Sequence, residues 1–157
     1  MFKKSFFRSR SLNIIILFIS IFYVIIMIRL LFLAGRSHYL DSYRYNLIPL
    51  KTIKQYVINR EYYNSETWIK NLFGNIILFI PLGLSIPILN HRFLKVLPFL
   101  ILNLLILLSV ELIQVFSRVG TFDVDDIILN ILGALIGLVI TRLVVGVLFA
   151  RVNTDNS

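Results

Sequence analysis

The sequence contains no cysteine and only two histidines among its 157 residues. The absence of cysteine excludes disulfide bonds, thiolate nucleophiles and cysteine-ligated zinc. The histidines, His38 and His91, lie on different predicted loops, so a histidine-based zinc site is not expected either. We therefore predict a protein with no metal site and no cofactor.

Common catalytic motifs are also missing. The sequence has no G-x-S-x-G, no H-E-x-x-H, no P-loop and no C-x-x-C. "DVDD" at residues 123–126 is not an EF-hand loop, because the glycine and the terminal glutamate of that loop are not in place. A non-enzymatic role is favoured, and an enzyme remains the alternative.

Hydrophobic residues, by contrast, are abundant at 58% of the chain, and they gather in four long runs. The runs cover residues 12–33, 71–89, 96–116 and 126 into the 140s, each close to the roughly 20 residues that cross a bilayer as a helix. The predicted fold is all-α, a small polytopic membrane bundle of about four transmembrane helices. Pro81 and Pro87 are expected to bend or shorten the second helix.

The orientation follows from the positive-inside rule. Lys3, Lys4, Arg8 and Arg10 precede the first run, and four crossings then place both termini in the cytoplasm. The predicted parts are a basic start with the first span (1–33), an external loop with three further spans (34–145) and a tail (146–157). The net charge of +8 suits lipid contact rather than nucleic-acid binding, since no base-stacking module accompanies it.

The external loop carries several basic residues of its own, which argues against this orientation, but the first span usually dominates. Within the loop, Leu50, Ile53, Tyr56 and Val57 would share one face of a helix. This pattern predicts an interfacial amphipathic helix, and a solvated loop with one amphipathic turn is the alternative.

Polar residues interrupt three of the spans. Projection at about 100° per residue puts Asp126 and Asn130 on one stripe with two glycines, and it puts Asn103, Glu111 and Gln114 on one arc. Because carboxylates in a membrane are costly, these faces should turn inward and find partners. We predict a polar cluster at the external end, with Arg118 as the nearest cation. Its members are Asn71, Asn75, Glu111, Gln114, Arg118, Asp123, Asp125, Asp126 and Asn130.

The expected roles within the cluster differ. Asp123 is predicted to be an N-cap with Asp126 at the third helical position, and for Asp123 and Asp125 capping and function both remain open. For Glu111 and Asp126 function is favoured, and these two would be the acid–base pair of an enzyme. A role as interhelical hydrogen-bond partners explains Asn71, Asn75 and Asn130 at least as well as ligand binding does. Helix packing is expected at Gly74, Gly83, Gly133 and Gly137.

Four segments follow one another in a distinctive order. They are "NLIPLKTI" at 46–53, "NLFGNIILFIPLGLSIPIL" at 71–89, "SVELIQVF" at 109–116 and "RVGTFDVDDIILNILGALIG" at 118–137. This series resembles the VanZ-like family of bacterial membrane proteins over residues 46–137. The matching positions include the polar cluster, apart from Arg118, together with Asn46, Pro49, Phe79, Pro81 and Gly120.

The resemblance implies a function. The family is named for a resistance protein of Gram-positive bacteria. The resemblance implies that this protein lowers susceptibility to lipoglycopeptides such as teicoplanin and that it acts at the outer face of the plasma membrane. The expected partners are the lipid bilayer and either a lipoglycopeptide or a lipid-linked cell-wall precursor. The alternatives are an intramembrane enzyme that modifies such a precursor and a small transporter subunit, which would need to form a homo-oligomer.

The predicted orientation can be tested with single cysteines, because the chain has none of its own. Cysteines at Ser5, Asn90 and Ser157 should resist an impermeant thiol reagent on intact cells, and one at Thr121 should react. Labelling at Ser157 with protection at Thr121 would invert the orientation.

Overall fold

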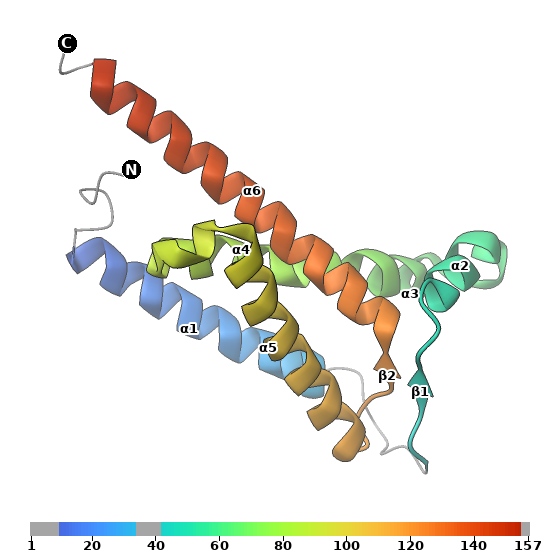
Figure 1. Cartoon of the computed structure of the whole chain (residues 1–157). Coiled ribbons are helices and arrows are strands. Elements are labelled where there is room, and N and C mark those ends of the chain that lie inside the picture. The colour runs from blue at the N-terminus through green and yellow to red at the C-terminus, as the bar shows by residue number, and fades with distance from the viewer. Residues whose placement is uncertain (1–9, 34–41, 155–157) are drawn as a thin grey trace.

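The computed structural model describes residues 10–33 and 42–154, and this part of the chain is almost entirely helical (Figure 1). Four helical stretches are long and apolar enough to cross a membrane, which confirms the predicted all-α bundle. They are Asn13–Phe32, Ser65–Leu89, Val96–Phe116 and Val124–Val147. The predicted basic residues Lys3, Lys4 and Arg8, His38 and the last three residues of the tail lie outside the described residues.

Three of the spans are single helices, α1 (Arg10–Phe32), α5 (Val96–Phe116) and α6 (Val124–Thr154), and the second span is composite. It begins with α3 (Ser65–Ile69), continues as the π-helical turn η3 (Lys70–Gly74) and ends as α4 (Asn75–Leu89). Asn64 caps its start by accepting a hydrogen bond from the Thr67 amide at 2.7 Å. The span thus begins before the predicted residue 71, and Pro81 and Pro87 do not end it before Leu89.

Successive spans run in opposite directions, so α1 begins and α6 ends at the same end of the bundle (Figure 1). The end where α5 finishes and α6 starts is called the acidic end below. At the opposite end, the 3-10 turn η4 (His91–Leu94) joins α4 to α5, and we call this the η4 end.

Helices α4 and α6 form the most extensive helix–helix contact, and glycines allow their close approach. A Cβ atom added at Gly133 would overlap the carbonyl oxygen of Ile76, and one at Gly83 would overlap that of Ala134. Gly137 is equally confined. Because the neighbouring atoms belong to the backbone, no side chain can move aside to make room, so the glycine stripe of α6 faces α4.

Gly74 does not share this role. A Cβ atom there would meet only the Lys70 side chain, at an ordinary distance of 3.8 Å. At Gly74, unlike at Gly83, Gly133 and Gly137, the structure therefore shows no close approach of another helix.

The remaining two spans complete the core around this helix pair. Phe79 of α4 and Leu138 of α6 pack with Phe99 and Leu107 of α5, and Met27 of α1 is buried against the same cluster. Most of the apolar surface of α1 stays exposed, as is expected for a helix that faces lipid.

Two connections meet at the acidic end. Strand β1 (Tyr45–Asn46) pairs in parallel with β2 (Phe122–Asp123), which leads directly into α6. After β1 the backbone turns through Leu50, whose φ of 64° lies in the left-handed region, and α2 (Lys51–Ile58) begins. A short 3-10 turn, η2 (Arg60–Tyr62), then leads toward α3. Helix α2 occupies the place of the predicted amphipathic helix.

The close contact between α4 and α6 predicts that Gly133→Leu and Gly137→Leu lower both the melting temperature and the abundance of the protein. Overpacking in a core costs about 1–3 kcal/mol, and backbone neighbours leave little room for relaxation. Gly146→Leu is the matched control, because nothing lies within 4 Å of a Cβ atom at that position. Thermal unfolding in detergent measures the difference. Equal melting temperatures for all three variants would refute the contact.

Candidate functional site

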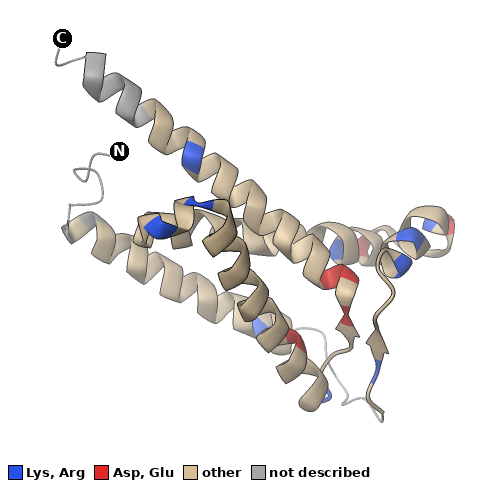
Figure 2. Cartoon of the chain, in the orientation of Figure 1, with Lys and Arg blue, Asp and Glu red and all other residues tan. Residues whose placement is uncertain are grey.

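Acidic residues lie at the acidic end, where α5 ends and β2 leads into α6 (Figure 2). Asp123, Asp125 and Glu111 are all buried there, and Asp126 is half-buried. Burial of several carboxylates needs hydrogen-bond donors that replace the lost water. The residues that supply these donors define the candidate site.

Asp125 receives its donors from the start of α2. Its carboxylate, with no exposed surface, accepts hydrogen bonds from the backbone amides of Leu50 (2.5 Å), Thr52 (2.7 Å) and Ile53 (3.1 Å). The first amides of a helix have no partner within the helix and carry partial positive charge, so they suit an anion. Asp125 therefore caps α2, which lies more than seventy residues earlier in the sequence. The sequence pattern around Asp125 predicts capping only at the start of its own helix, α6.

Asp123 is the N-cap of α6 and has further partners. Its Oδ1 accepts hydrogen bonds from the Asp125 amide (2.9 Å) and from the Asn46 side chain (3.1 Å). Its Oδ2 accepts one from the Thr52 hydroxyl (2.6 Å), which in turn accepts one from Asn46 (3.0 Å). The β1–β2 register places Asn46 directly beside Asp123. Capping alone is thus an incomplete account of this residue.

The other two carboxylates connect the spans. Glu111 of α5 accepts a hydrogen bond from the Asp123 amide at 3.3 Å. Asp126 of α6 accepts one from the Asn75 side chain of α4 at 2.6 Å. Together these bonds link α4 and α5 to the start of α6 at the acidic end.

Several predicted members of the cluster have other partners. Asn71 donates to the Thr67 carbonyl of its own helical segment (2.7 Å), and Gln114 donates to the Leu31 carbonyl of α1 (2.9 Å). The Arg118 guanidinium lies over the Tyr43 ring, 5.1 Å from its centroid. Asn130 is buried farther along α6, and its Oδ1 has no partner among the described residues. Asn71, Gln114 and Arg118 thus have contacts with residues outside the predicted cluster.

Within the described residues, no group of three or more histidine, aspartate or glutamate side chains could hold a metal ion. The carboxylates act instead as hydrogen-bond acceptors that fix the first connection of the chain to the start of α6. We call this arrangement the α2 clasp, formed by Asn46, Thr52, Asp123 and Asp125.

The sequence profile of the VanZ/LLP1 family matches residues 16–145, which is most of the chain. The chain belongs to the VanZ-like family. The Protein VanZ of Enterococcus faecium is 28% identical to it over 95 residues. That match covers 60% of this chain and 58% of the relative, so the chain spans less than two thirds of the relative's length. No solved structure matches the VanZ-like chain.

Sequence reasoning missed Thr52, which contributes both an amide and a hydroxyl group to the α2 clasp. Its signal lies in the segment "NLIPLKTI", whose resemblance to the VanZ-like family covers Asn46 and Pro49. A polar residue in the first turn after a proline-containing turn is a candidate partner for a distant carboxylate. Nothing local identifies Asp125 as that carboxylate.

Tyr56 of α2 faces the acidic residues. Burial raises the pKa of its phenol above 10.0, and Tyr63 and the carboxylates of Asp126 and Asp123 raise that pKa further. The phenol therefore remains a neutral hydroxyl group at physiological pH. Helix α2 is also held at its far end, because the Trp68 indole donates to the Tyr56 carbonyl at 2.9 Å.

The α2 clasp predicts that Asp125→Asn releases the start of α2. An asparagine would turn an NH2 group toward backbone amides that need an acceptor. Hydrogen exchange at the Thr52 and Ile53 amides should then accelerate about ten- to a hundredfold, since a hydrogen bond to a charged group contributes about 1.5–3 kcal/mol. The Thr67 amide, which Asn64 holds in the same protein, should exchange as in the wild type. Unchanged exchange at Thr52 would contradict the role of Asp125.

Proposed function

We propose that this VanZ-like protein lowers bacterial susceptibility to lipoglycopeptide antibiotics such as teicoplanin, and that it acts at the outer face of the plasma membrane. In this proposal the acidic end faces outward and both termini are cytoplasmic. The family membership supports the proposal, and so does the similarity to the Protein VanZ of Enterococcus faecium.

The observation that carries the proposal is the α2 clasp. Residues that resemble the family's motif, among them Asn46, Asp123 and Asp125, hold α2 at the end of the bundle. The helix exposes apolar Val57 and Ile58 together with basic side chains. A surface of this kind suits a membrane interface, where a lipid-anchored antibiotic or a lipid-linked cell-wall precursor would also lie.

The proposal predicts a selective change in susceptibility. Expression in a susceptible Gram-positive host should raise the minimal inhibitory concentration of teicoplanin more than that of vancomycin, because vancomycin lacks the acyl chain that inserts into the outer leaflet. Growth assays with both antibiotics measure the difference. An unchanged response to teicoplanin at confirmed membrane expression would refute the proposal.

Two isosteric variants then test the acidic end. Asp126→Asn and Glu111→Gln preserve shape and remove charge, so insertion should be as easy as in the wild type or easier. We expect normal membrane levels with lost teicoplanin protection. Glu61→Gln and Glu66→Gln are the controls, because they remove exposed carboxylates near the same end and outside the cluster. Full protection in all four variants would show that the charges of Glu111 and Asp126 are not needed for resistance and have a structural role only.

A further inference from the structure

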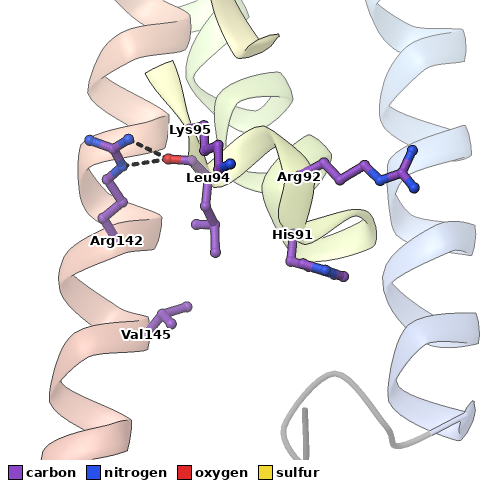
Figure 3. A pocket seen from close by; sticks show the side chains of 6 residues that line it. All are labelled: His91, Arg92, Leu94, Lys95, Arg142 and Val145. Atoms are coloured by element: carbon purple, nitrogen blue, oxygen red, sulfur yellow. Dashed lines mark hydrogen bonds between the residues drawn. The ribbon is translucent and has the colours of Figure 1, made fainter. Parts of the chain in front are cut away.

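A cavity of about 600 Å³ opens at the η4 end, far from the α2 clasp (Figures 1 and 3). It lies between α6 and the turn that joins α4 to α5. Among the described residues, its lining comes from the connection between α4 and α5 and from α6 (Figure 3). These lining residues are His91, Arg92, Leu94, Lys95, Arg142 and Val145.

The lining combines two kinds of surface. Leu94 and Val145 are buried and give the cavity an apolar floor. Arg92, Lys95 and Arg142 are exposed around it, and no acidic residue is among the six lining residues. The cavity therefore offers positive charge beside an apolar surface.

Arg142 is held in place at the cavity. Its Nε atom donates to the Leu94 carbonyl at 2.8 Å, and its Nη2 atom donates to the same oxygen (Figure 3). A guanidinium group carries five N–H donors in one plane. Fixing two of them on a backbone oxygen orients this plane before any ligand binds, which lowers the entropic cost of binding.

From the lengths of the spans, we expect the cavity to lie at the level where a bilayer changes from hydrocarbon to headgroups. Helix α4 ends at Leu89 and α5 begins at Val96, so the turn between them follows directly on two apolar spans. Arg142 lies about 27 Å along α6 from Val124 at about 1.5 Å per residue. The hydrocarbon core is about 30 Å thick, which places Arg142 near its edge.

We propose that this cavity binds the headgroup phosphate of an anionic phospholipid in the leaflet at the η4 end. The cations pair with the phosphate, and the apolar floor contacts the glycerol and the first methylene groups of the acyl chains. A free phosphate ion shares the charge of the headgroup, but it cannot cover Leu94 and Val145. The proposal is independent of antibiotic resistance, because it concerns the opposite end of the bundle.

Native mass spectrometry of the full-length protein in detergent tests this assignment. The protein is mixed with equal amounts of phosphatidylglycerol and phosphatidylcholine that carry the same acyl chains. We expect preferential retention of phosphatidylglycerol, and millimolar inorganic phosphate should not displace it. Equal retention of the two lipids would overturn the proposal. Displacement by inorganic phosphate would identify an anion site rather than a lipid site and would overturn it as well.

Matched double variants locate the lipid. Arg92→Gln with Lys95→Gln should weaken phosphatidylglycerol binding about thirtyfold, because each basic residue near an anionic surface contributes roughly a fivefold factor. Arg44→Gln with Lys70→Gln removes the same charge from exposed positions near the acidic end and should retain the lipid. Equal loss in both variants would show a general charge effect and refute the site. All four side chains are exposed, and melting temperatures check that each variant folds.

Discussion

The organisation of the acidic end depends on one carboxylate. Asp125 is fully buried, and its two oxygens accept hydrogen bonds from three amides that lie 72 to 75 residues away in the sequence. These amides replace the water that the charge loses on burial, and the charge satisfies the otherwise unpaired start of α2. Each partner thus compensates a cost that the other would carry if it were buried alone. The β1–β2 pairing and the bonds of Asp123 to Asn46 and Thr52 hold the same connection beside the start of α6.

Much of the bundle could be predicted from the sequence because a bilayer permits few backbone structures. Long apolar runs become helices, since lipid offers no partner for an open backbone. Polar residues in such helices turn inward for the same reason, and Asn103, Glu111 and Gln114 of α5 are all buried. The glycine stripe of α6 and the pairing of Asn75 with Asp126 follow from the same helical projection.

Hydrogen-bond partners could not be predicted where they depend on how the spans assemble. A projection at about 100° per residue puts Asn71 on the same face as Asn75, but it does not give the partner of either residue. Asn71 donates to the Thr67 carbonyl of its own helical segment. Gln114 bonds to α1, and Thr52 bonds to residues more than seventy positions away. No local pattern encodes such contacts, because they depend on how the spans assemble.

The order of synthesis gives the contact between α4 and α6 a further consequence. Both α2 and α4 leave the ribosome before α6. Helix α6 carries Asp125, which binds the start of α2, and the glycine stripe that packs against α4. Until α6 enters the membrane, the start of α2 lacks its anion and the close-packing face of α4 is open to lipid. Helix α6 thus completes the contacts of both earlier helices, and a nascent chain interrupted before residue 124 would lack them.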